Sequence, residues 1–166
     1  MANMIPISTV TVGSGGASSI DFNNIPQIYT DLIIKVSGRN SSTGANNFLF
    51  TFNGSTSSFT LRQLYGTGAA AGSTTTPARY AGEYTGTDMT SNTFSSVDIY
   101  IPNYSGSNNK SYSVDDVTEN NATTSYAVLS AGLWSNTSPI TSISLALTGG
   151  TLAQYSSATL YGIRKY

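Results

Sequence analysis

Residues 18–38 read SSIDFNNIPQIYTDLIIKVSG and contain the clearest strand of the chain. The apolar residues Leu32, Ile34 and Val36 occupy alternate positions, with Asp31, Ile33 and Lys35 between them. A period of two is what a half-buried β-strand requires, so residues 29–36 are predicted as the central strand. Residues 23–26 are predicted as a turn before it, because asparagine tolerates left-handed backbone and Pro26 removes a ladder donor.

The same alternation of short strand and polar turn continues along the chain. Strands are predicted over residues 4–12, 29–36, 48–52, 59–65, 93–101, 109–118, 126–134, 140–147 and 159–163. The segment 59–65 also fits one helical turn, and no other stretch has a sustained helical period. About nine strands without a significant helix predict an all-β fold, an antiparallel jelly-roll-like β-sandwich. At 166 residues the chain suits a single domain over 1–166, with 1–16 as an N-terminal arm or first edge strand.

Two further segments carry structural predictions. Phe48, Phe50 and Phe52 alternate strictly and are predicted to face the core, and Asn53-Gly54 after them is a strong hairpin signal. Residues 66–88 are rich in Gly, Ala, Thr and Ser and show no helical period. A connection of this length is functional or contact-making, unless it contains strands that the pattern does not reveal.

The composition excludes several classes of enzyme. The chain has no cysteine and no histidine, so it lacks thiol nucleophiles, thiolate metal sites and the commonest general base. The one carboxylate cluster, Asp115, Asp116 and Glu119, lacks the spacing of a calcium loop and is interpreted as a solvated strand end. Nothing in the sequence indicates the paired carboxylates of a glycosidase. We therefore expect no enzymatic activity and no cofactor or metal.

The charge pattern limits the partners. Charged residues make up 9% of the chain and the net charge is −1, so no basic face is available for nucleic acid. No stretch approaches 18 apolar residues, and the N-terminus lacks the pattern of a signal peptide. We expect no nucleic-acid or membrane partner. With so few charges, the surface must consist mainly of hydroxyl and amide groups.

Two segments are candidate contact sites. In the arm, Ile5, Ile7, Val10 and Val12 are apolar, and the glycine-rich residues 13–16 would let the arm reach a neighbouring subunit. The alternative is that residues 4–12 form the first strand of their own sandwich. Arg79, Tyr80 and Tyr84 in the 66–88 segment form the second candidate patch.

Several motifs together resemble a group of tailed-bacteriophage virion proteins. They are FNNIP at 22–26 with YTDL at 29–32, FNG at 52–54, IPNY at 101–104, GLW at 132–134 with ITSI at 140–143, and ATLYGI at 158–163. Members of this group, from marine and cyanobacterial phages especially, are compact β-sandwich modules that serve as capsid decoration (cement) proteins or tail-fibre modules. The motifs are turns and strands, and the family has no catalytic residues to transfer.

The resemblance implies a location on the virion. The first expectation is a decoration protein that forms a homotrimer and is bound to the major capsid protein at the outer capsid surface. The alternative is a receptor-binding head of a tail fibre that contacts a glycan on the host surface.

Overall fold

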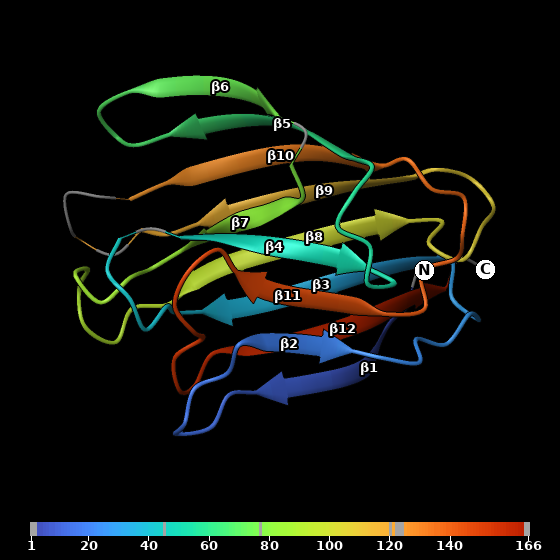
Figure 1. Cartoon of the computed structure of the whole chain (residues 1–166), viewed down its shortest axis with the longest axis horizontal. Coiled ribbons are helices and arrows are strands. Elements are labelled where there is room, and N and C mark those ends of the chain that lie inside the picture. The colour runs from blue at the N-terminus through green and yellow to red at the C-terminus, as the bar shows by residue number, and fades with distance from the viewer. Residues whose placement is uncertain (1–2, 45, 77, 120, 122–124, 165–166) are drawn as a thin grey trace.

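The computed structural model describes residues 3–44, 46–76, 78–119, 121 and 125–164. Over these ranges the chain forms twelve strands in two antiparallel sheets and contains no helix. Figure 1 shows the smaller sheet lying over the larger one, with the core between the two layers. The predicted all-β antiparallel sandwich is therefore confirmed.

The two sheets differ in size. The larger has eight strands in the order β1 (Asn3–Thr11), β12 (Ser157–Arg164), β3 (Asp31–Gly38), β8 (Ser95–Pro102), β9 (Lys110–Val117), β10 (Ala127–Trp134), β5 (Phe59–Gly66) and β6 (Ala71–Thr76). The smaller has four, in the order β2 (Ser19–Phe22), β11 (Ile143–Leu147), β4 (Asn46–Phe52) and β7 (Tyr80–Tyr84). Beyond the edge of the smaller sheet, β5 and β6 project as a hairpin (Figure 1).

Three of the twelve strands were not predicted. β2 is only four residues long and lies within the stretch that was assigned to a turn and one strand. β6 and β7 both lie in residues 66–88, which were predicted as a connection. The sequence of β6, AGSTTT, contains no large apolar residue, and the side chains described for residues 71–75 do not belong to the core. The segment 59–65, which was ambiguous, is strand β5.

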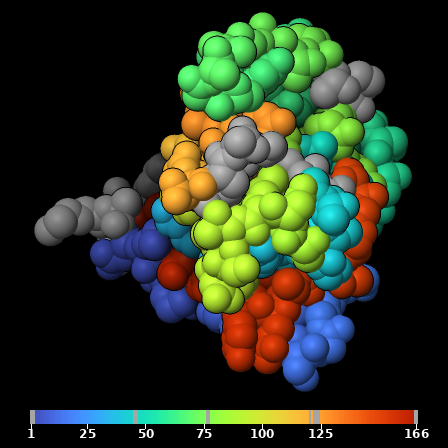
Figure 2. Space-filling view, turned by 90° about the vertical axis from the view of Figure 1, so that its left-hand side faces the viewer, coloured from blue at the N-terminus to red at the C-terminus, as the bar shows by residue number. Residues whose placement is uncertain are grey.

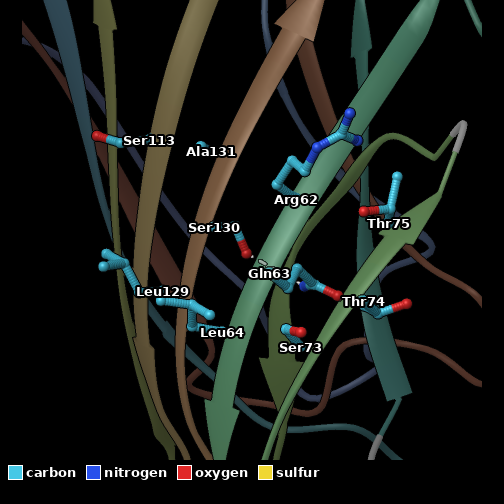
Figure 3. Close-up of a pocket in the computed structure, with 10 residues that line it drawn as sticks. All are labelled: Arg62, Gln63, Leu64, Ser73, Thr74, Thr75, Ser113, Leu129, Ser130 and Ala131. Carbon is cyan, nitrogen blue, oxygen red and sulfur yellow. Dashed lines mark hydrogen bonds between the residues drawn. The ribbon is translucent and has the colours of Figure 1, made fainter.

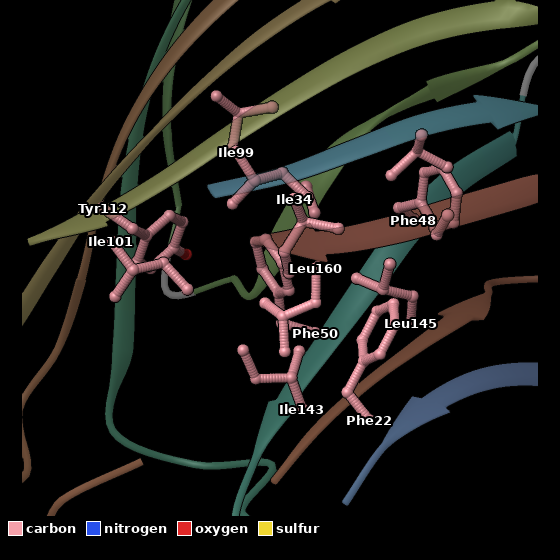
Figure 4. Close-up of a cluster of buried hydrophobic side chains, with 14 of the residues drawn as sticks. Phe22, Ile34, Phe48, Phe50, Ile99, Ile101, Tyr112, Ile143, Leu145 and Leu160 are labelled. Carbon is pink, nitrogen blue, oxygen red and sulfur yellow. The ribbon is translucent and has the colours of Figure 1, made fainter. Parts of the chain in front are cut away.

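The core follows the predicted alternation. The inward residues of β3 and β4 are all buried: Leu32, Ile34, Val36, Phe48, Phe50 and Phe52. Tyr112 of β9 meets Phe50 edge-on, with the ring centroids 5.2 Å apart, and Trp134 of β10 meets Phe52 at 5.6 Å. Figure 4 shows side chains from both sheets meeting in this layer. Interlocked aromatic rings of this kind stabilise the contact between the sheets.

Asp31 is buried although it alternates with the core residues of the central strand. It lies on the face opposite Leu32, Ile34 and Val36, yet it is only 1% exposed. The Tyr100 hydroxyl donates a hydrogen bond to Asp31 Oδ2 at 2.8 Å, and the Asn103 backbone N–H donates to Oδ1 at 3.0 Å. These donors compensate the carboxyl group for the loss of water.

A β-bulge allows the N-terminal strand to bury its apolar residues. The register of β1 against β12 shifts between Pro6 and Ser8, so the strand contains one extra residue. Without that shift, Ile7 and Val10 would lie on opposite faces; both pack against the core. Residues 3–11 are thus the edge strand of their own sandwich in this structure.

The Asn53-Gly54 turn forms, but it does not make the predicted hairpin. Both residues have positive φ, 53° and 73°, as a tight two-residue turn requires. The strands on either side, β4 and β5, belong to different sheets. Asn53 Oδ1 instead accepts hydrogen bonds from the Thr141 and Ser142 backbone N–H groups at 2.8 and 3.1 Å, which fixes the corner to the chain before β11.

Candidate functional site

The outer face of the eight-stranded sheet has an exposed apolar surface over β9, β10 and β5. Leu64 of β5 and Leu129 of β10 are direct cross-strand partners, and they are 61% and 56% exposed. Val117 of β9 is 41% exposed and pairs with Ala127 of β10. We call Leu64, Val117, Ala127, Leu129 and Ala131 the leucine surface. Figure 3 shows its two leucines side by side on neighbouring strands.

The strand register arranges the outer face of β9, β10, β5 and β6 in three rows. The first row is Ser113, Ala131, Arg62 and Thr75. The second row is Asp115, Leu129, Leu64 and Ser73, and the third is Val117, Ala127, Gly66 and Ala71. The apolar centre is thus bordered by hydroxyl groups and by one positive and one negative side chain.

The leucines lie between two shallow hollows. One has a volume of about 510 Å³ and is lined by the ten residues drawn in Figure 3, Arg62 among them. The other, also about 510 Å³, includes Asp115 and Tyr65 in its lining. A single exposed leucine is ordinary, but two adjacent ones with apolar neighbours are typical of a contact surface. Full burial of each would contribute about 1.5 to 3 kcal/mol.

The charges at this surface lack partners within the chain. Among the Lys and Arg side chains in the described ranges, Arg62 alone makes no hydrogen bond, ion pair or ring contact. Among the carboxylates in the described ranges, those of Asp115 and Glu83 have no hydrogen-bond or ion-pair partner. Of these two, Asp115 lies beside the leucine surface. By contrast, Lys35 and Asp98, on the same face of the sheet, form an ion pair.

A second, smaller site lies under the projecting hairpin. A pocket of about 230 Å³ is lined by Gln63, Tyr65, Thr74, Glu83, Tyr126 and Val128. Burial raises the pKa of Glu83 above its usual value. Gln63 is held in place by the hydrogen bond that its Nε2 donates to Ser130 Oγ at 3.1 Å. Two aromatic rings, an amide and a carboxyl group in one small pocket suit a polar ligand with an apolar face, such as a sugar.

Next to this pocket, Asp116 is fully buried between the sheets. Its Oδ2 accepts a hydrogen bond from the Glu83 backbone N–H at 2.6 Å, while Oδ1 has no partner. Burial, together with the nearby carboxylates of Glu83 and Asp115, raises the pKa of Asp116 from 3.8 to about 8, although the hydrogen bond from the Glu83 N–H acts to lower it. Burial therefore favours the protonated carboxyl group, while the hydrogen bond that links Asp116 of β9 to the Glu83 N–H of β7 favours the carboxylate.

The carboxylates that were considered for calcium do not converge. Asp115 and Asp116 are consecutive on β9, so one points to solvent and the other into the core. Glu119 lies beyond the strand and accepts a hydrogen bond from the Asn121 N–H at 2.7 Å. The described part of the chain contains no group of three or more metal-ligating side chains.

The arm residues pack on their own domain. Val12 is buried, Ile7 and Val10 pack partly buried against the core, and Ile5 is half-buried. The Val12 N–H also donates to the Ser156 carbonyl at 2.8 Å. Contact with a neighbour through these side chains stays a prediction. The other long edge of β1 has no strand neighbour in the described residues and is open to one.

The second predicted patch is mostly engaged in the fold. Tyr84 is fully buried, so its ring has no surface to offer a partner. Arg79 Nη1 donates to the Phe50 carbonyl at 2.6 Å, and Tyr80 packs partly buried against the core. The three residues lie close in sequence but do not form one exposed patch.

Sequence reasoning did not identify the leucine surface. The prediction for residues 126–134 placed Leu129, Ala131 and Leu133 opposite Val128 and Trp134 and took Ala131 and Gly132 as signs of a buried strand, but one face of this strand is exposed. A strand with apolar residues on both faces is a usable signal of a contact surface. Only one face can pack on the core of the domain, so a partner must cover the other. Arg62 and Asp115 carry no comparable signal in the sequence.

No helix in the described ranges is long and apolar enough to span a membrane. Comparison of the chain with family models and with curated proteins finds no match to either.

Proposed function

We propose that the chain is a structural protein of a tailed-bacteriophage virion, a decoration protein on the outer surface of the capsid. The observation that carries the proposal is the leucine surface, because adjacent exposed apolar side chains on a soluble sandwich indicate a protein contact. The resemblance of the turn and strand motifs supplies the virion as the setting. The proposed partner is the major capsid protein, and the proposed assembly is a trimer.

The way the chain uses its charges supports a rigid assembly module. Arg39 Nη1 donates to the Thr93 carbonyl at 2.7 Å and Nη2 donates to the Met89 carbonyl at 3.2 Å. Lys110 is buried, and its Nζ donates to the Gly106 carbonyl at 2.8 Å. Charged donors on backbone carbonyls hold loops firmly. The remaining surface has little charge, so attachment must come from apolar and backbone contacts, such as those the open edge of β1 can make.

Cryo-electron microscopy of the virion that carries this chain tests the proposal directly. We expect copies spread over the icosahedral shell, with the leucine surface of each copy covered by protein. A shell without the protein, or copies whose leucine surface faces solvent throughout, would contradict it.

The pocket under the hairpin favours a second candidate, the receptor-binding head of a tail fibre. Tyr65, Tyr126 and Glu83 could contact a host-surface glycan there. Titration with host polysaccharide would then show saturable binding that Tyr126→Ala weakens. Tyr155→Ala, which removes an exposed ring elsewhere, is the matched control and should leave binding unchanged.

A further inference from the structure

We propose that the leucine surface binds a second copy of this chain, face to face, and that Arg62 of each copy pairs with Asp115 of the other. The inference rests on the proposed function only in taking this surface as a protein contact. It adds the identity of the partner and the charges that align it. Figure 2 shows the β5–β6 hairpin (green) at one end of the molecule, beside β10 (orange).

The register makes the surface self-complementary. Leu129 lies on β10, the middle strand of the apolar rows, with Leu64 on one side and Asp115 on the other. A two-fold axis parallel to β10 would place Leu129 against Leu129 of the second copy. The same axis would place β5 of one copy over β9 of the other. Arg62 of each copy would then approach Asp115 of the other, so the dimer would contain two such contacts.

The remaining offset between those two charges is small. Arg62 and Asp115 lie in adjacent rows, two residues or about 7 Å apart along the strands. Sheets that pack face to face lie about 10 Å apart and cross at about 30°. A long guanidinium side chain can cover that distance. The pairing would satisfy the one described cation that has no partner within the chain.

The size of the surface sets the expected strength. Four strands at about 4.8 Å spacing and about 24 Å length present roughly 450 Å² of projected area on each copy. Two copies would therefore bury on the order of 1000 Å², the lower end of specific interfaces. We expect a reversible dimer with a dissociation constant in the micromolar range. A face-to-face pair has two-fold symmetry, so a trimer would have to form through another surface.

Charge reversal gives the sharpest test. Sedimentation of the full chain, from micromolar to millimolar concentration, should show a monomer–dimer equilibrium that high salt weakens. Arg62→Glu and Asp115→Lys should each weaken association at least tenfold, because each creates two like-charge contacts per dimer. The double variant should restore the dissociation constant to within about threefold of the original value, because opposite charges then face each other again. The four proteins form a double-mutant cycle that measures the coupling between the two positions. Leu129→Asp should abolish it.

Matched controls separate this effect from general changes in charge or apolarity. Asp21→Lys reverses the charge at an exposed position on β2 of the smaller sheet and should leave association unchanged. Ile28→Asp alters an equally exposed apolar residue away from the surface and should also leave it unchanged. Circular dichroism of every variant verifies the fold, and the altered positions on the leucine surface are exposed.

The outcomes distinguish this inference from the proposed function. A chain that stays monomeric, a trimer insensitive to the reversals, or single variants that the double does not rescue would each overturn the self-pairing. If the chain is monomeric but Leu129→Asp prevents binding to capsid shells, the occupant is the capsid protein and the proposed function stands. If the dimer behaves as expected but the protein does not bind capsids, the inference stands and the proposed function fails.

Discussion

At the scale of single residues, the carboxyl group of Asp116 lies where water cannot reach it. Asp116 has a hydrogen bond to one oxygen and none to the other. Burial raises its pKa to about 8, above the 3.8 expected for the unfolded chain. Between pH 3.8 and about 8, the folded protein therefore keeps a proton on Asp116 that the unfolded chain has released. The contribution of Asp116 to stability is therefore fully present below about pH 4, and it is lost as the pH rises toward 8.

Asp116→Asn should remove most of this pH dependence. The amide keeps the oxygen that accepts the Glu83 N–H and cannot ionise, so the variant should be more stable than the original chain at pH 7, by on the order of 4 kcal/mol. Urea unfolding at pH 4, 6 and 8 measures the slope. Asp21→Asn, at an exposed position on β2, is the control and should leave it unchanged. Equal slopes for the original chain and Asp116→Asn would contradict the prediction.

Phe50 provides a second test at this scale, because its ring lies at the centre of the layer between the sheets. Phe50→Ala should destabilise the protein by about 3 to 5 kcal/mol, through lost burial and the cavity left behind. Leu49→Ala, on the other face of the same strand and only half-buried, should have a clearly smaller effect. Chemical denaturation measures both. An effect of Phe50→Ala below about 1 kcal/mol would show that this ring is not part of the core.

At the scale of elements, β1 is held by β12, about 150 residues away in sequence. Its bulge places Ile7 and Val10 toward the core on one side of the strand. The element therefore contributes to the stability of its own domain, whatever its open edge binds.

Removal of residues 1–12 should lower the melting temperature by roughly 10 °C. The loss of Val12 and the partly buried Ile7 and Val10 corresponds to about 3 to 6 kcal/mol. Thr9→Ala, which removes only the exposed hydroxyl contact with Thr159, should change it by less than about 2 °C. A truncated protein with an unchanged melting temperature that no longer binds capsids would instead indicate an arm that reaches a neighbour.

At the scale of the whole molecule, the sandwich presents a polar pocket under the hairpin and an apolar leucine surface, and we expect neither to catalyse a reaction. The protein should release no reducing sugar from cell-wall or capsule polysaccharides, because the proposed roles require contact only. A reducing-sugar assay at pH 5 to 8 measures this, with heat-denatured protein as the control. Turnover that is lost in Glu83→Gln would show that the pocket is an active site.

The sequence by itself determined the fold class and much of the core. Alternation is a local property of a strand, so the buried faces of Leu32, Ile34 and Val36 and of Phe48, Phe50 and Phe52 could be read directly. It could not reveal β6, because an edge strand of small polar residues has no apolar period. The turn at Asn53-Gly54 was also visible in the sequence. The sequence did not show that the chain passes from one sheet to the other at this turn.

Only the tertiary structure decided which surfaces remain for partners. Val128 and Leu129 are neighbours with similar apolar character, and one is buried while the other is exposed because the smaller sheet covers a single face of β10. Arg62, Leu64, Asp115 and Leu129 meet on one face through the pairing of β5, β10 and β9. Such a surface depends on contacts between residues far apart in the chain, whereas a sequence pattern records only the preferences of near neighbours.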